Sequence, residues 1–323
     1  MRVAFLVLNH RRPAQLVRLL TTLRAQLPDA PIVVHHDVFH GELPGEVISH
    51  LDNVHLLASG KRMMWGDFSI MEVCCWSLTW MQEHLEFDWV VMLSAQDYPI
   101  KSLANLADNL AQAGADAVFS AVPLSELTIA ERMKARQRYL FQYGTSAPDW
   151  SASSRSGIRG LLRRGTRSLV AAVNVVQPLF KLYRLPDGMP YRFGWRARST
   201  PFDDSWPCWK GSQWFAMSRC GLEYVLTYLV DHPEYVNYYR RTMVPDESML
   251  ATIVFNSRYL RVANRDVTYT RWRIGSGHPD IFETVDLLEL AAVPQYFARK
   301  FDIDKDERIL DELDKLIAKN IIA

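Results

Sequence analysis

Short apolar runs alternate with longer amphipathic segments over the first 122 residues of the chain. Four runs have the length and composition of buried strands: 3–8, 32–36, 88–93 and 116–122. Pro13 can occupy the first turn of a helix over 14–27, where leucines recur at helical spacing, and Ser69 is expected to cap a helix that ends near Glu83. This alternation predicts an α/β fold with a Rossmann-like, mostly parallel central sheet flanked by helices.

Polar side chains follow three of these predicted strands. His10 follows the first strand, Asp37 follows the second, and the segment 94–98 (SAQDY) follows the third. Ligands of open α/β sheets bind outside the carboxyl ends of the strands. We therefore interpret residues 1–122 as a nucleotide-binding half and expect these side chains around one pocket.

The rest of the chain divides into two further parts. Residues 123–205 are rich in arginine and contain an apolar stretch within 161–183, which suits an anionic membrane surface, an acidic acceptor or a solvated helical insertion. Residues 206–323 return to ordered patterns and are interpreted as the C-terminal half of the fold. Expected elements there are a strand around 214–217, a helix over 221–230, a helix after Pro245 and an amphipathic helix over 305–317.

Composition limits the possible partners. The 323 residues are 49% hydrophobic, which suits a globular protein, and the formal net charge of +1 gives no reason to expect nucleic acid as a partner. The apolar run at 3–8 is too short for a signal sequence or a membrane span. We expect a cytoplasmic protein whose segment 155–198 could touch a membrane peripherally.

Two short segments of the C-terminal part could carry chemistry. Glu247 follows Pro245 and Asp246 at a predicted helix start, where a carboxylate would be held rigidly, although acids in a first helical turn also have an ordinary capping role. Arg299 and Lys300 are adjacent cations between aromatic residues, a pair that suits a diphosphate but also occurs on ordinary surfaces. Neither segment is specific by itself.

Taken together and in order, several segments resemble one enzyme family. They are 4–10 (AFLVLNH), Trp65-Gly66, 93–100 (LSAQDYPI), 211–215 (GSQWF), 244–248 (VPDES) and 297–302 (FARKFD). This combination resembles the core-2/I-branching N-acetylglucosaminyltransferase and peptide O-xylosyltransferase family, glycosyltransferase family 14. Three of the segments are more similar to the xylosyltransferase branch.

The resemblance implies a GT-A fold and an inverting enzyme that needs neither a metal nor another cofactor. The donor would be UDP-N-acetylglucosamine or UDP-xylose, and the acceptor a glycan, a protein or a lipid-linked sugar. Glu247 matches the general base. Arg299 and Lys300 match the pair that binds the diphosphate, and the strand end at Ser94–Asp97 lacks the DxD motif that holds a cation in many GT-A enzymes. The DxD spacings within 302–306 are interpreted as solvated helix-leading acids.

Six further positions are candidates for donor binding, and most also have a structural interpretation. Asp97 could contact a sugar or cap its loop, and Asp37 could bind uracil or ribose or be a satisfied loop residue. Tyr98 and Trp214 could stack on a sugar, although Trp214, within an apolar strand, could instead belong to the core. The full set is His10, Asp37, Asp97, Tyr98, Gln213 and Trp214.

The sequence also departs from the family pattern. Gln213 stands where the xylosyltransferase-like pattern has Asp, which weakens the case for xylose or for a protein acceptor. Asp280 stands where some relatives have a phosphate-binding arginine, so Arg271 or Arg273 could substitute for it. The alternative function is a non-catalytic protein on the same fold that binds glycans or a membrane surface. A kinase is disfavoured because the chain has no Walker-type loop.

Overall fold

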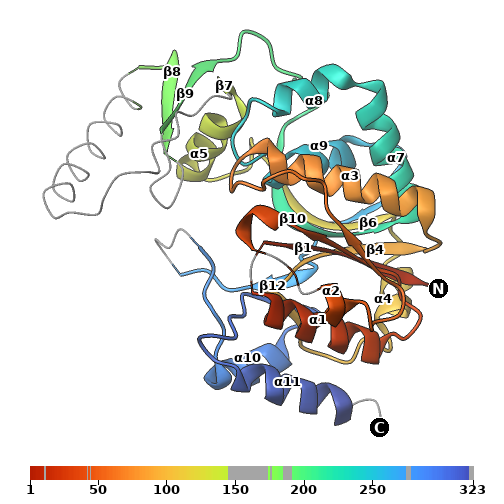
Figure 1. The fold of residues 1–323 in the computed structure, drawn as a ribbon. Coiled ribbons are helices and arrows are strands. Elements are labelled where there is room, and N and C mark those ends of the chain that lie inside the picture. Colours follow the sequence, from red (N-terminus) through yellow and green to blue (C-terminus); the bar gives the residue numbers. More distant parts are fainter. Residues whose placement is uncertain are drawn as a thin grey trace, which may run out of the picture.

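A seven-stranded sheet runs through the middle of the molecule, and helices cover both of its faces (Figure 1). The computed structural model describes residues 1–319 except 11, 42, 44, 145–173, 175, 176, 185–190 and 274–277. The strand order is β11-β6-β10-β4-β1-β2-β3. The bounds are β1 (Val3–Asn9), β2 (Ile32–His36), β3 (Val54–Leu57), β4 (Trp89–Ser94), β6 (Ala117–Pro123), β10 (Trp209–Ser218) and β11 (Val262–Ala263).

Most neighbouring strands of this sheet are parallel. β1 pairs in parallel with β2 and β4, β2 with β3, and β6 with β11, whereas β10 is antiparallel to β4 and β6. The predicted mixed α/β architecture with a mainly parallel sheet is confirmed. The four strands expected in the first 122 residues are present within one or two residues of their predicted bounds.

Both faces of the sheet are buried, which explains why its strands are continuous apolar runs rather than alternating ones. In β1, Leu6 and Leu8 belong to one core cluster and Phe5 and Val7 to the other. The first face is covered by α3 (Phe68–His84), α5 (Ile129–Tyr139), α7 (Arg219–Asp231), α8 (Pro233–Tyr239) and α9 (Met249–Asn256). The second is covered by α1 (Pro13–Gln26), α2 (Gly45–Ile48), α4 (Leu106–Gln112), α10 (Leu287–Ala292) and α11 (Arg308–Lys319).

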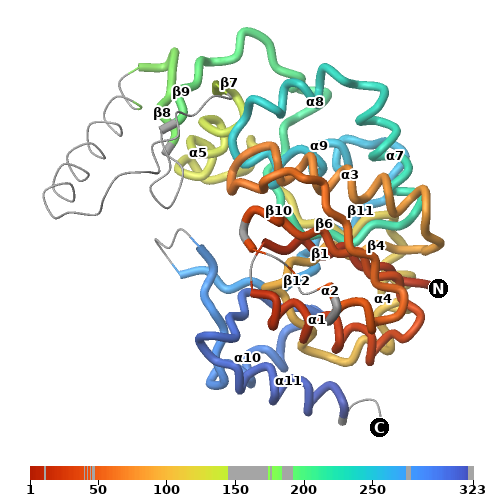
Figure 2. Tube along the Cα trace, in the orientation of Figure 1, coloured from red at the N-terminus to blue at the C-terminus, as the bar shows by residue number. Residues whose placement is uncertain are grey.

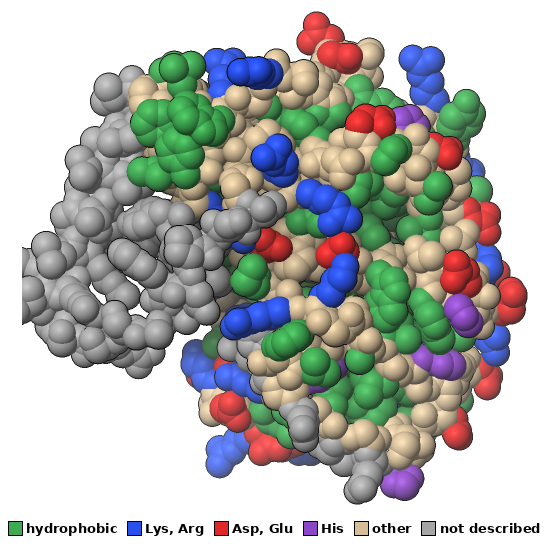
Figure 3. Space-filling view, turned by 45° about the horizontal axis from the view of Figure 1, so that its top comes forward, with side chains coloured by type: hydrophobic (Ala, Val, Ile, Leu, Met, Phe, Trp, Pro, Cys, Tyr) green, Lys and Arg blue, Asp and Glu red, His purple; other side chains and the backbone are tan. Residues whose placement is uncertain are grey.

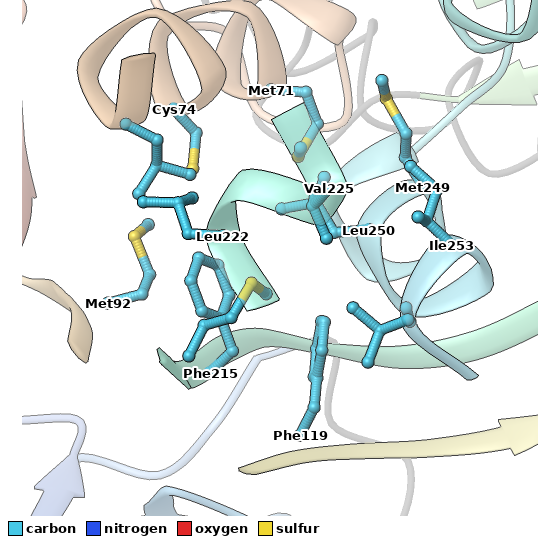
Figure 4. Packing of buried hydrophobic residues seen from close by; sticks show 14 of the residues in the cluster. Met71, Cys74, Met92, Phe119, Phe215, Leu222, Val225, Met249, Leu250 and Ile253 are labelled. Atoms are coloured by element: carbon cyan, nitrogen blue, oxygen red, sulfur yellow. The ribbon is translucent and has the colours of Figure 1, made fainter. Parts of the chain in front are cut away.

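The first core cluster holds β10 in place. Phe215 of β10 packs with Leu222 and Val225 of α7, with Met71 of α3 above them and Ile253 of α9 beside them (Figure 4). These side chains are at most 2% exposed. Burying a side chain of this size contributes about 1.5–3 kcal/mol. The contacts with α3, α7 and α9 therefore hold β10 firmly on the first face of the sheet.

Two smaller sheets flank the central one. The first has the order β12-β13-β5, from β12 (Thr268–Thr270), β13 (Phe297–Arg299) and β5 (Asp97–Pro99). The second has the order β7-β9-β8, from β7 (Phe141–Tyr143), β9 (Tyr191–Arg196) and β8 (Phe180–Arg184). Three 3-10 turns complete the described elements: η1 (Val38–His40), η2 (Pro245–Glu247) and η3 (Thr284–Asp286).

The helices α1 and α11, from the early and late parts of the chain, lie side by side on the second face (Figure 2). Arg18 of α1 makes ion pairs with Asp311 at 2.6 Å and Asp314 at 2.7 Å, both on α11. The predicted amphipathic helix over 305–317 is present but begins at Arg308. The backbone N–H of Arg308 donates to Asp306 Oδ1 at 3.0 Å, which satisfies one of the free donors at the start of this helix.

Some predicted boundaries are wrong. Asp67, not Ser69, is the N-cap of α3, because Asp67 Oδ1 accepts a hydrogen bond from the backbone N–H of Ser69 at 2.8 Å. Pro245 opens the 3-10 turn η2, and the helix α9 starts separately at Met249. The acids at 246 and 247 therefore lie before the helix rather than in its first turn.

Much of the arginine-rich segment lies outside the described residues. Its described parts form α5, β7, β8 and β9, whereas most of the predicted membrane contact over 155–198 falls at undescribed positions. Within the part of the chain that the structure describes, no helix is long and apolar enough to cross a membrane. The three-part division at 122 and 205 stays a prediction.

Candidate functional site

The ends of β1, β2 and β4 meet at one edge of the central sheet, as the sequence predicted. The side-chain amide of Asn9, at the end of β1, lies 3.0 Å from His36 Nδ1 at the end of β2. The backbone N–H of Asp37 donates to Asn9 O at 2.9 Å, and that of Ala95 donates to Leu8 O at 3.1 Å. His10, Asp37 and the segment 94–98 therefore start from one edge, and we call this the strand edge.

At the strand edge, Asp97, Trp214 and Arg299 form one cluster, which we call the donor-side cluster. Asp97 is fully buried, and its Oδ2 accepts hydrogen bonds from the backbone of Ser94 and from Trp214 Nε1 at 2.9 Å. Arg299 Nε lies 3.2 Å from Asp97 Oδ1, and the guanidinium carbon lies 3.7 Å from the centroid of the Trp214 ring. Strand pairing explains the contact, because Arg299 of β13 stands directly opposite Asp97 of β5.

The charges of this cluster are unequally exposed. Burial raises the pKa of Asp97 above its ordinary value, and the positive charge of Arg299 opposes that shift. The Nε–Oδ1 contact is an ion pair rather than an aligned hydrogen bond. Arg299 keeps 13% of its side chain exposed, and its two terminal nitrogens make no hydrogen bond within the described part of the chain. The cluster thus buries the acid fully and leaves part of the arginine exposed.

Lys300 follows Arg299 and is held through its backbone. Its N–H donates to Asp280 O at 3.3 Å, and its carbonyl accepts from Phe282 N at 2.9 Å. The carboxylate of Asp280 in turn contacts Arg271 Nε at 3.2 Å and Arg273 Nε at 2.9 Å. The half-buried Lys300 is therefore placed beside Arg299 by the loop that contains Asp280.

The suggestion that Arg271 substitutes for a phosphate-binding arginine does not fit its contacts. Beyond Asp280, its guanidinium reaches Asp286 at 2.8 Å and Glu289 at 2.6 Å, and it lies 4.8 Å from the centroid of the Phe282 ring. Three carboxylates and a ring already occupy this side chain, so Arg271 is a structural link between β12 and α10. Arg273 is 75% exposed and is therefore the more accessible of the two arginines to a phosphate group.

The interpretation of Tyr98 as a sugar-stacking platform is wrong. Its ring is fully buried, and its hydroxyl lies 2.7 Å from Thr22 Oγ1 on α1 and donates to Asp314 Oδ1 on α11 at 2.7 Å. No face of the ring is open to a ligand, because side chains alternate along β5 and Tyr98 points away from Asp97. Tyr98 therefore belongs to the core.

The other predicted donor-binding residues have mixed placements. Asp37 is fully buried, and its oxygens accept backbone N–H groups of Phe39 at 3.0 Å and Met63 at 2.7 Å, which explains it as a loop residue. Gln213 and Trp214 are half-buried in a register shift of β10. One face of Trp214 is covered by Arg299. Contacts of His10, Asp37, Gln213 and Trp214 with a donor stay predictions.

Glu247 lies at the end of η2, next to the start of β10. The backbone N–H of Val244 donates to Gly66 O at 2.9 Å, so the predicted motifs Trp65-Gly66 and 244–248 lie together. Ser248 Oγ donates to Trp209 O at 2.7 Å, which fixes the turn to the start of β10. Glu247 keeps 29% of its side chain exposed, and its Oε2 lies 2.6 Å from Arg138 Nη1 on α5. We call Arg138, Asp246 and Glu247 the base-side cluster.

Asp246, the neighbour of Glu247, is a second acid in this cluster. It is 8% exposed, and its Oδ1 has no hydrogen-bond partner among the described residues. Burial, and after it the negative charge of Glu247, raises the pKa of Asp246 to about 7. The base-side cluster therefore combines one carboxylate paired with an arginine and one buried carboxyl group that titrates near neutrality.

β10 connects the two clusters, since Trp209 contacts the Glu247 turn and Trp214 contacts Asp97. Between them, Gly211 lies so close to its neighbours that a Cβ there would be 2.8 Å from Ser120 O and 2.9 Å from the Cβ of Ala251. The Gly-Ser-x-Trp-Phe motif thus needs its glycine for close packing against β6 and α9.

On the face shown in Figure 3, acidic and basic side chains are intermixed.

The acids of the DxD spacings have partners within the protein. Asp302 and Asp304 make ion pairs with Arg12, the latter at 3.0 Å, and Asp306 accepts hydrogen bonds from Thr284. Among the residues that the structure describes, no group of three or more His, Cys, Asp or Glu side chains is arranged to hold a metal ion.

Sequence reasoning missed the partners of Glu247. Arg138 is one of many arginines in the segment 123–205, and Tyr183, whose hydroxyl accepts from Arg138 Nε at 3.2 Å, follows no motif. Arg192 of β9, almost fully buried, pairs with Asp67 at 2.5 Å next to the Trp65-Gly66 motif. No local pattern could reveal these contacts, because their partners lie between 45 and 125 residues apart.

The chain is similar in sequence to several known proteins. Three similar curated proteins are Xylosyltransferase oxt of Drosophila melanogaster, Xylosyltransferase 2 of Rattus norvegicus and Xylosyltransferase 2 of Homo sapiens. Each is 24% identical over 338 to 347 residues, covering 97% of this chain but 33% of the relative. The chain thus spans about a third of the length of these relatives.

Similarity to solved structures is weak. A 4-diphosphocytidyl-2C-methyl-D-erythritol synthase from Anaerococcus prevotii matches with a TM-score of 0.31 and 8% identity, over 71% of this chain and 75% of that one. The bifunctional IspDF from Campylobacter jejuni matches with a TM-score of 0.24 and 14% identity, over 41% of this chain and 36% of that one. Neither similarity is strong enough to indicate a function.

The model of one protein family, described as Core-2/I-Branching enzyme, matches residues 3–292. The match includes Asp97, Trp214 and Glu247, and it ends before Arg299. Because it covers most of the chain, the chain belongs to the Core-2/I-Branching enzyme family.

Proposed function

We propose that this protein is an inverting, metal-independent glycosyltransferase of the GT-A type. It would move N-acetylglucosamine or xylose from a UDP-sugar to a hydroxyl group of a glycan, a protein or a lipid-linked sugar. Membership of the family and the similarity to xylosyltransferases support the reaction class. The observation that carries the mechanism is Arg299, which Asp97 and Trp214 hold rigidly at the strand edge while its terminal nitrogens make no hydrogen bond within the described part of the chain.

In the proposed reaction, the acceptor oxygen forms a bond to the anomeric carbon while the bond from that carbon to the diphosphate oxygen breaks on the opposite face. Glu247 accepts the proton of the acceptor hydroxyl. Its Oε2 faces Arg138, and its Oε1 makes no hydrogen bond within the described part of the chain, so Oε1 is the atom that takes the proton. UDP then leaves with one more negative charge than it carried in the donor.

Arg299 and Lys300 would stabilise the charge that develops on the diphosphate. A fixed cation lowers the free energy of the transition state because it needs no reorganisation as the charge appears. The backbone of Lys300 and the strand pairing of Arg299 hold both residues in place before any ligand binds. These two side chains would thus supply the positive charge that a bound cation supplies in enzymes with a DxD motif.

A non-catalytic glycan-binding protein on the same fold is the second candidate. Phe193 and Trp195 on β9 are 40% and 58% exposed, and their ring centroids lie 5.0 Å apart. Exposed aromatic rings of this kind suit stacking on sugars. This function predicts glycan binding without either UDP binding or turnover.

The decisive test combines binding and turnover. Calorimetry with UDP in the presence of EDTA should show binding, and Glu247→Gln should bind UDP with unchanged affinity. The same variant should lower kcat by about 10²- to 10⁴-fold, because the general base is lost. UDP, UDP-xylose and UDP-N-acetylglucosamine should be screened first for protection against thermal unfolding, which identifies the donor. Failure to bind UDP without metal, or full activity of Glu247→Gln, would show that the proposed mechanism is wrong.

A further inference from the structure

Arg138 is the one described cation that contacts Glu247, and it is held from several directions. Its Nη1 lies 2.6 Å from Glu247 Oε2, and its Nε donates to the hydroxyl of Tyr183 on β8 at 3.2 Å. Its backbone carbonyl accepts a hydrogen bond from Met243 N at 3.1 Å. The side chain of Arg138 is 16% exposed, which is less than the 29% of Glu247. The arginine therefore lies behind the carboxylate, on the protein side.

The three-stranded sheet β7-β9-β8 holds this arrangement in place. Tyr143 and Tyr183 pack edge to face, with ring centroids 6.0 Å apart, in a small core that also contains Met243 and Val244. The backbone N–H of Tyr143 donates to Arg241 O at 2.6 Å. The sheet thus contacts the segment before Glu247 through both side chains and backbone.

The electrostatics favour a lasting ion pair. Burial disfavours the charge of Arg138, but the negative charge of Glu247, together with Tyr139 and Tyr183, raises the pKa of the guanidinium above its ordinary value. Asp246, the other acid of the base-side cluster, weakly supports the same charge, and the buried hydroxyl of Tyr139 lies in the same region. Since an arginine does not deprotonate in proteins, Arg138 keeps its charge throughout a reaction.

We infer that Arg138, supported by Tyr183, is a positioning residue for the base, which makes the β7-β9-β8 sheet part of the catalytic apparatus. This inference rests on the proposed function. Arg138 holds Oε2 and thereby orients Oε1 toward the position of the acceptor hydroxyl. The proton passes from the acceptor oxygen to Oε1, and Arg138 neither gives nor takes a proton.

A double-mutant cycle on kcat tests this role. The variants are Arg138→Gln and Glu247→Gln, alone and combined, and the assay measures UDP released from the most stabilising UDP-sugar with water as the acceptor. Arg138→Gln should lower kcat by roughly 10- to 100-fold, as expected for a misplaced catalytic group, while the KM for the donor stays within twofold. In the Glu247→Gln background it should have no further effect, because the group it positions is gone. Arg138→Lys should restore part of the lost kcat.

Arg240→Gln is a matched control, since Arg240 pairs with Glu72 at 3.0 Å and is 45% exposed. It should leave kcat unchanged in both backgrounds. The inference is overturned if Arg138→Gln leaves kcat unchanged, if its effect is equally large in the Glu247→Gln background, or if it acts on the donor KM alone. Should Arg138→Gln not fold, Tyr183→Phe replaces it in the same cycle, with a smaller loss of kcat expected only when Glu247 is present. Full activity of Glu247→Gln would instead show that the proposed function has failed.

Discussion

The donor-side and base-side clusters are built from the same pair of groups, a carboxylate and an arginine, but in opposite order. At the strand edge Asp97 is fully buried, and Arg299, with 13% of its side chain exposed, is the more exposed partner. In the base-side cluster Arg138 is 16% exposed, and Glu247, at 29%, is the more exposed partner. Which member of an ion pair faces solvent decides which charge is offered to a ligand. The first cluster suits binding of an anion, and the second suits acceptance of a proton.

The largest expected effect tests the burial of the donor-side pair. Arg299→Met should destabilise the protein by about 3–5 kcal/mol, because Asp97 would remain buried without a partner. Arg138→Met should cost only about 1 kcal/mol, since the Glu247 that it leaves behind is partly solvated. Urea unfolding at pH 7.5 measures both values.

Asp97→Asn combined with Arg299→Met is the control for this difference. Removing both charges should recover most of the stability, because a neutral amide costs less to bury than a carboxylate. UDP affinity should stay low in the double variant. Equal destabilisation by Arg299→Met and Arg138→Met would contradict the contrast between the two clusters.

The next effect depends on pH and concerns Asp246. Its pKa is raised from the ordinary 3.8 to about 7 in the folded protein. The unfolded chain therefore releases this proton at lower pH than the folded one, and the native state loses stability as the pH rises from about 4 to about 7. A shift of about three pH units corresponds to a loss on the order of 4 kcal/mol. Asp246→Asn should remove that loss.

Urea unfolding at pH 4.5 and pH 8 checks this expectation. The variant should match the original protein at the lower pH and should be more stable at the higher pH. Asp231→Asn, at the exposed end of α7, is the control and should change stability equally at both values. A stability difference for Asp246→Asn that does not vary with pH would contradict the raised pKa.

The smallest expected effect concerns Tyr98, which neighbours Asp97 but belongs to the core. Tyr98→Phe should lower the free energy of unfolding by about 1 kcal/mol, because it removes the hydrogen bond to Asp314, which remains paired with Arg18. Its affinity for UDP, measured by calorimetry, should not change. A clear loss of UDP binding would contradict the assignment of Tyr98 to the core and would indicate that it contributes to donor binding.

Several features could be predicted from the sequence because they depend on local patterns. The apolar runs of β1, β2, β4 and β6 indicated buried strands, and the polar residues after them indicated the strand edge. The motif around Glu247 and the pair Arg299-Lys300 were recognised as family motifs. The stacking prediction for Tyr98 is wrong, because an aromatic residue in a short strand can point to either face, and only the position of α1 and α11 decided which.

The sequence by itself determined the α/β class, the strand edge and a short set of candidate residues, because strand composition and strand ends leave local signatures. Only the tertiary structure decided how those residues work. It placed Arg299 opposite Asp97 through the pairing of β13 with β5, and it brought Arg138 and Tyr183 to Glu247 from the segment interpreted as an insert. Ion pairs between residues far apart in the chain leave no periodic signal, so the exposure and direction of each charge became known only when the chain was folded.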